Sequence, residues 1–176
     1  MDKLDAYNMT GVYAVGNHEY MNGSFASTSN SPEVREKYVL NAQGRAEAGE
    51  NYVIYCLGTN SSHGSSWAYD DSQVTTLTNY LNSVSNDKVI IILTHFPLHN
   101  YGSHRTSNTK PVLDAINASA VGEDGTYGTA DDKKIVFLWG HNHSEGDNNY
   151  DQVWGPGDTL PDDNKSTAHF YYAAAG

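Results

Sequence analysis

The sequence predicts an α/β fold with a parallel sheet, because strand-like and helix-like segments alternate along the chain. Residues 52–58 and 88–94 are apolar and rich in β-branched side chains, as buried strands are. Between them, Val74, Leu77 and Leu81 recur at helical spacing. The order strand, helix, strand is the unit from which parallel sheets are built.

A second observation concerns the ends of the strands. Three predicted strands each run into polar residues that include histidine: 11–15 into Gly16-Asn17-His18-Glu19, 90–93 into Thr94-His95-Phe96-Pro97, and 135–139 into Gly140-His141-Asn142-His143. In open α/β sheets, ligands bind outside the carboxyl ends of the strands. A hydrogen-bonded loop histidine explains one such end. Three of them favour a shared site, and imidazole is the commonest metal ligand in proteins.

Local signals predict the remaining elements. In chain order these are a loop at 20–31, a helix from Pro32 to about Asn41, a turn at 44–50, a loop at 61–66, a short strand at 67–69, a helix capped by Asp70, a helix from Pro111 through about Ala118, an acidic loop at 122–132, and antiparallel strands at 150–154 and 169–174. The acidic loop loosely resembles a calcium-binding turn, but its spacing fits no EF-hand, which favours a solvated loop.

Composition limits the classes of function. The 176 residues suit one domain, and the net charge of −11 argues against a nucleic-acid backbone or an anionic membrane as the main partner. No run of eighteen apolar residues is present, so no membrane span is predicted. The single cysteine, Cys56, is expected to be a small buried hydrophobe. Low lysine content with many Asn, Ser, Thr and Tyr residues leans towards an exported bacterial protein.

Taken together and in this order, the three histidine-bearing motifs resemble the third, fourth and fifth motifs of the calcineurin-like metallophosphoesterases. The resemblance covers most of the chain from about residue 11. It implies a layered β-sandwich flanked by helices, with two sheets packed between them (α/β/β/α). It also implies that phosphate esters are hydrolysed at a dinuclear centre with a metal-bound hydroxide as the nucleophile. Imidazole, amide and carboxylate ligands together suit Mn, Fe, Zn or Ni.

The resemblance assigns roles to particular residues. It implies four metal ligands: Asn17, His95 and His141 on one ion, and His143 on the other. His18 would contact the substrate phosphate and help the leaving oxygen depart, and Glu19 would orient His18. Separately from the resemblance, Arg105 could hold a phosphate through two hydrogen bonds, and His99 on the same loop could meet the substrate. A polar loop with a surface arginine is the alternative for both.

The family's first two motifs, Asp-x-His and Gly-Asp, have no counterpart before Gly16. We therefore expect residues 1–176 to be the carboxyl-terminal part of a catalytic domain that is incomplete at its amino terminus, so that the isolated chain is inactive. Two alternatives stay open at this stage. One is a non-catalytic module that binds a metal or a phosphate, and the other is a surface interaction domain whose histidines are structural.

Overall fold

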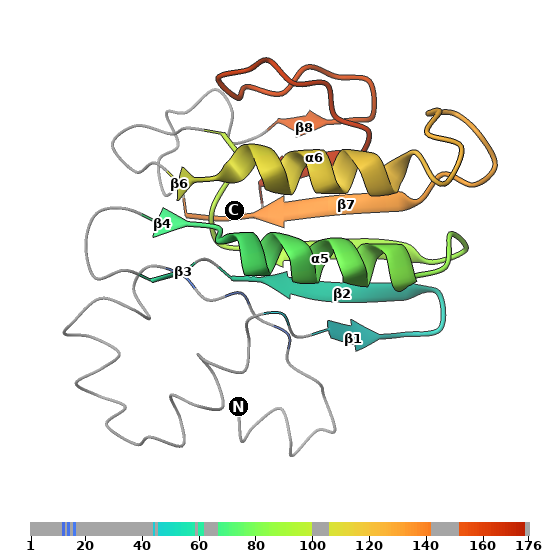
Figure 1. Ribbon diagram of the computed structural model, residues 1–176, viewed down its shortest axis with the longest axis horizontal. Coiled ribbons are helices and arrows are strands. Elements are labelled where there is room, and N and C mark those ends of the chain that lie inside the picture. Colours follow the sequence, from blue (N-terminus) through green and yellow to red (C-terminus); the bar gives the residue numbers. More distant parts are fainter. Residues whose placement is uncertain are drawn as a thin grey trace.

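The computed structural model describes residues 46–58, 60–61, 67–99, 106–141 and 152–174, together with Val12, Ala14, Gly16 and Gly44. Within these residues the chain forms an α/β fold with a six-stranded, mixed, mostly parallel sheet and two helices (Figure 1). The α/β class predicted from the sequence is thus confirmed.

The six-stranded sheet carries most of the ordered backbone. In spatial order its strands are β1 (Ala46–Ala48), β2 (Tyr52–Leu57), β5 (Val89–Thr94), β7 (Lys134–Trp139), β9 (Tyr171–Ala174) and β8 (Val153–Trp154). The four central strands are parallel to one another, and β1 and β8 run antiparallel at the two edges. A smaller sheet consists of β3 (Asn60–Ser61), β4 (Trp67–Ala68) and β6 (Thr106–Ser107).

Both helices, α5 (Asp71–Ser83) and α6 (Thr109–Ala120), lie side by side on one face of the large sheet (Figure 1). Helix α5 begins where Asp70 closes a capping box: its carboxylate accepts from the Gln73 amide, and the Gln73 side chain accepts from the Asp70 amide. Burying Leu77 and Leu81 then fixes which side of α5 meets the sheet.

The strand register divides the sheet into two faces. Side chains that alternate along β2, β5, β7 and β9 point into one buried core under the helices, for example Tyr55, Ile92, Phe137 and Tyr172. The intervening residues form the second face, defined here by Ile54, Ile91, Leu93, Val136 and Leu138, which is apolar but only half-buried. None of these five residues belongs to the core cluster.

Most predicted elements are confirmed. These are the strands at 52–58, 67–69, 88–94 and 134–139, the helix capped by Asp70, and the antiparallel pairing of the strands within 150–154 and 169–174. Helix α6 begins at Thr109, two residues before the predicted start. The predicted helix from Pro32 to Asn41 and the loop at 20–31 lie outside the described residues.

Two predictions are wrong. The turn expected at 44–50 contains β1, because Ala46–Ala48 pairs with β2 as a hairpin although alanine and glutamate have low β propensity. The strand expected at 11–15 is not formed at its two described residues, Val12 and Ala14. A strand is defined by hydrogen bonds to a neighbour, and apolar composition alone supplies none.

The capping box generates a testable prediction. Asp70→Ala removes the acceptor for the Gln73 amide and should lower the free energy of unfolding by about 1 kcal/mol in urea titrations. The Ser72 hydroxyl and the Gln73 amide hold the pKa of the Asp70 carboxyl below its ordinary value of 3.8. A lowered pKa stabilises the fold above the unfolded-state value, so this contribution is lost as the pH falls through the folded-state value. Asp70→Asn keeps an acceptor and is the control. An unchanged urea midpoint for Asp70→Ala would contradict the assignment.

Candidate metal site at the strand ends

Two of the predicted histidines lie at the carboxyl ends of neighbouring parallel strands and touch each other. The amide of Gly140 donates to the carbonyl of His95 at 3.1 Å, which joins the two chain segments directly after β5 and β7. This pairing brings His95 Nε2 to 3.0 Å from His141 Nδ1. The sequence positions are 46 residues apart, so only the parallel register places them together.

The third motif reaches the same point through Gly16, which is buried. A Cβ atom built on Gly16 would lie 2.8 Å from both Nδ1 and Cε1 of the His95 ring. Real Cβ atoms essentially never approach so closely, and therefore only glycine lets the backbone lie against this imidazole. The structure thus brings together one residue from each of the three predicted motifs.

His141 is held in an unusual conformation. Its φ angle is +77°, in the left-handed region that residues with a side chain rarely adopt. The rings of Phe96 and His95 pack against its imidazole, with centroids 4.7 Å and 4.9 Å away. Strained backbone of this kind costs on the order of 1–3 kcal/mol and gathers at functional sites.

His99 lies in the core, with 3% of its surface exposed. Its Nδ1 is 2.7 Å from the Tyr172 hydroxyl, and its ring packs edge-on against Trp139 with centroids 5.1 Å apart. The substrate role of His99 stays a prediction. Arg105, Asn17, His18, Glu19 and His143 lie outside the described residues, so their roles also stay predictions.

The donor chemistry of the pair fits a transition metal. Two imidazole nitrogens on one ion, each at 2.0–2.1 Å from it, are about 2.9–3.4 Å apart, and the His95–His141 separation of 3.0 Å falls in this range. Within the ranges that the structure describes, no group of three His, Cys, Asp or Glu side chains is placed to hold an ion. The pair is therefore a partial donor set.

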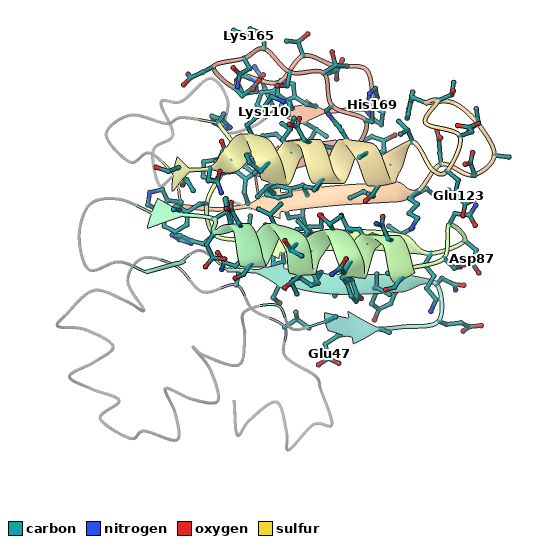
Figure 2. The ribbon with its side chains drawn as sticks, in the orientation of Figure 1. Glu47, Asp87, Lys110, Glu123, Lys165 and His169 are labelled. Atoms are coloured by element: carbon teal, nitrogen blue, oxygen red, sulfur yellow. The ribbon has the colours of Figure 1, made fainter. Side chains whose placement is uncertain are left out.

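The carboxylate of Asp131 in the acidic loop at 122–132 accepts hydrogen bonds from donors within the same loop. The Asp131 carboxylate accepts from the amides of Glu123 and Asp124 and from the Thr129 hydroxyl, and the Thr129 contact is the main reason that the pKa of this carboxyl is lowered. This accounts for the loop without a cation. Figure 2 shows Glu123 and Asp87 at the end of the sheet where β5 and β7 begin, away from the histidine pair.

No protein-family model matches this chain, and no curated protein matches it either. The likeness to metallophosphoesterases therefore rests on the three motifs and on their convergence. Among the described residues, no helix is long and apolar enough to cross a membrane. Cys56 is buried, as expected.

Some residues that shape the site carried no recognisable signal in the sequence. The packing of Phe96 on His141 and the hydroxyl contacts of Tyr69 and Tyr172 depend on which strands are neighbours. The one sequence signal was Gly16 itself, because a glycine at the end of an apolar run can mark a close approach of the backbone to a neighbouring group.

The Gly16 contact predicts a selective effect. Gly16→Ala should push the His95 ring away from His141 and shift the imidazole signals of both residues in ¹H–¹⁵N NMR spectra of the metal-free protein. Gly155→Ala is the matched control, because a Cβ there meets its nearest described atoms, Asp158 Oδ2 and Tyr171 Cε1, at an ordinary 3.7 Å. Unchanged His95 and His141 signals in Gly16→Ala would show that the backbone of residue 16 does not support the ring.

Proposed function

We propose that this chain contributes the later motifs of a calcineurin-like metallophosphoesterase domain, which hydrolyses phosphate esters with the help of two transition-metal ions. The observation that carries the proposal is the convergence of Gly16, His95 and His141 at one edge of the sheet. Two histidines from separate motifs and a glycine from a third lie together there, as a shared site requires.

His95 and His141 would hold one ion through the nitrogens that now face each other. Asn17 would complete that set, and His143 would belong to the second ion. When bound, the two metals would neutralise the phosphate oxygens and activate water. Their identity is a choice among Mn, Fe, Zn and Ni.

The roles of His18 and Glu19 follow from their place after Gly16. Gly16 lies against His95, so His18 is two residues from the metal-binding ring and within reach of a bound phosphate. An imidazolium there would donate a hydrogen bond to a phosphate oxygen and a proton to the leaving oxygen. The Glu19 carboxylate would favour that charged form of His18. The net charge of −11 makes positive charge at the site necessary for an anionic substrate.

The second face of the sheet supports the layered fold of the family. Its five defining side chains are apolar yet only half-buried. His95 follows Thr94, whose hydroxyl is bonded to Tyr69 in the core, so an extended chain at this point would turn the His95 side chain to the second face, in line with Leu93 and Ile91. Gly16 lies against that ring.

The sequence spacing before Gly16 matches the spacing before His95, which suits a second layer of chain over this face. Ala14 and Val12 precede Gly16 by two and four residues, as Leu93 and Ile91 precede His95. Extended chains rise about 3.3 Å per residue, so a segment running alongside β5 would set Ala14 over Leu93. Both Ala14 and Val12 are half-buried. We propose that residues 11–16 belong to a second layer over this face.

A cysteine pair tests this layer. With Cys56 replaced by alanine, Ala14→Cys with Leu93→Cys should form a disulfide under mild oxidation, seen as a mass loss and a faster-migrating band. Ala14→Cys with Thr75→Cys is the control, because Thr75 is exposed on α5, on the helix-covered side of the sheet. Equal cross-linking of both pairs, or of neither, would contradict the layer.

One observation favours a second candidate function, a module that binds a single metal without catalysis. The two facing imidazoles of His95 and His141 could hold one ion without a second metal beside it. Metal stoichiometry with hydrolysis of simple phosphate esters separates the two functions when it is measured on a protein that also carries the residues upstream of this chain. One ion without turnover there supports the module, and two ions with turnover support the enzyme.

Substitutions at two histidines test the division of roles. His141→Gly deletes a proposed ligand at a backbone angle that glycine adopts freely, so it should lower zinc affinity at least tenfold without unfolding the protein. In the complete catalytic domain, His18→Gln should lower the hydrolysis rate by roughly 10²–10⁴ while metal content is unchanged. The control is His169→Ala, because His169 lies on the loop before β9 and is not a proposed ligand. Loss of metal from His18→Gln would show that the roles are assigned wrongly.

A further inference from the structure

The segment 95–99, which leaves β5 at the site, is held by the hydroxyl groups of two buried tyrosines. Tyr69 lies just before α5, and Tyr172 lies on β9; both are fully buried. Tyr69 contacts the start of the segment and Tyr172 contacts its end. Both hydroxyl groups contact the backbone of this segment, Tyr69 at the Phe96 carbonyl and Tyr172 at the Leu98 amide.

At the start of the segment, the Tyr69 hydroxyl donates to the Phe96 carbonyl at 3.1 Å and lies 3.0 Å from Thr94 Oγ1. A phenol can donate only one hydrogen bond. Because Tyr69 donates it to the Phe96 carbonyl, the Thr94 hydroxyl is the donor in the second contact. Burial raises the pKa of Tyr69 well above the usual range, so the phenol keeps the proton that this contact needs. Phe96 is thereby fixed between its carbonyl contact and its ring contact with His141.

At the end of the segment, the Leu98 amide donates to the Tyr172 hydroxyl at 2.8 Å. The hydroxyl oxygen is an acceptor there, so its proton is available for His99 Nδ1 at 2.7 Å. This makes Nδ1 of His99 the acceptor. The Tyr172 ring itself is stacked on Phe137 and Trp139 of β7, with centroids 5.5 Å and 5.8 Å away.

The hydroxyls therefore connect the segment to two different parts of the core. Tyr172 connects the segment to β9 and to β7, and His141 follows the carboxyl end of β7. Tyr69 connects the segment to the amino-terminal end of α5. The Gly140 amide fixes the His95 carbonyl from the β7 side. A metal ligand must be held to within about 0.5 Å of its productive position, and groups that fix the backbone around it provide that precision.

We propose that Tyr69, Tyr172 and His99 are positioning residues for the metal ligand His95, which assigns His99 a role in the protein interior instead of at the substrate. The proposal rests on the proposed function, because it takes His95 to be a ligand. These three residues are called the tyrosine clamp below. The clamp sets the path of the segment 95–99 and thereby the distance from His95 to His141.

The first test is Tyr172→Phe, which deletes the hydroxyl and keeps the stacked ring. Zinc affinity, measured by competition with a chelator, should fall at least tenfold, and the His95 and His141 imidazole signals of the metal-free protein should shift. Tyr171→Phe is the matched control, because Tyr171 is the preceding residue on β9 and points to the other side, with 51% of its surface exposed. It should change neither readout.

The second test uses His99 and remains informative if Tyr172→Phe does not fold. His99→Asn offers a side-chain oxygen that can accept from the Tyr172 hydroxyl, whereas His99→Leu offers none. The clamp predicts near wild-type zinc affinity and unshifted His95 and His141 signals for His99→Asn, and at least a tenfold loss of affinity with shifted signals for His99→Leu. Equal behaviour of the two variants in the imidazole spectra would overturn the clamp.

The two readouts separate the clamp from the function on which it rests. If the wild-type protein binds no zinc, the proposed function fails, while the metal-free imidazole spectra still report whether the clamp sets the His95–His141 contact. If zinc binds but Tyr172→Phe leaves both the affinity and the spectra unchanged, the clamp fails and the proposed function stands. A shift of the spectra in Tyr171→Phe equal to that in Tyr172→Phe would also overturn the clamp.

Discussion

The parallel pairing of β5 with β7 is the constraint on which the rest of the structure depends. Its register runs from Val89 opposite Lys134 to Leu93 opposite Leu138, and beyond the strands the Gly140 amide donates to the His95 carbonyl. Parallel strands present their carboxyl ends at one edge, so residues far apart in sequence become neighbours there. A register shift of one residue would turn every core side chain to the other face and separate the two imidazoles.

The same register explains why the core and the site are linked. The alternation that buries Ile92 and Thr94 would, if continued by one residue, turn His95 towards the second face. Tyrosine hydroxyls at the edge of the core then meet the backbone of the segment that leaves β5. Polar contacts buried this way are costly when broken, which holds the segment to one path.

Several acidic side chains lie away from the site, and several bond to nearby backbone. Figure 2 places Glu47 on the edge strand β1, and Asp87 and Glu123 at the end of the sheet opposite the strand ends of the site. Many carboxylates act locally: Asp70 caps α5, and Asp131 and Asp162 accept from the backbone of their own loops. These carboxylates therefore serve local structure, and the proposed phosphate-binding site would need cations at the opposite edge.

Much of the fold could be predicted because local and global signals agree in the central elements. The apolar run 90–93 and the spacing of Leu77 and Leu81 allow few alternatives. β1 was missed because its residues become a strand only through pairing with β2. For the site, histidines after strands were visible in the sequence, but the support that Phe96, Tyr69 and Tyr172 give depends on strand order.

The most direct measurement is a titration of the protein with Co²⁺, a paramagnetic substitute for the native metal, followed by NMR of the imidazole protons. If His95 and His141 hold one ion, the signals of both rings will move far outside their normal range together, and both changes will be complete at the same metal-to-protein ratio. Shifts confined to one ring, or to neither, would contradict the claim that these strand ends form a metal site.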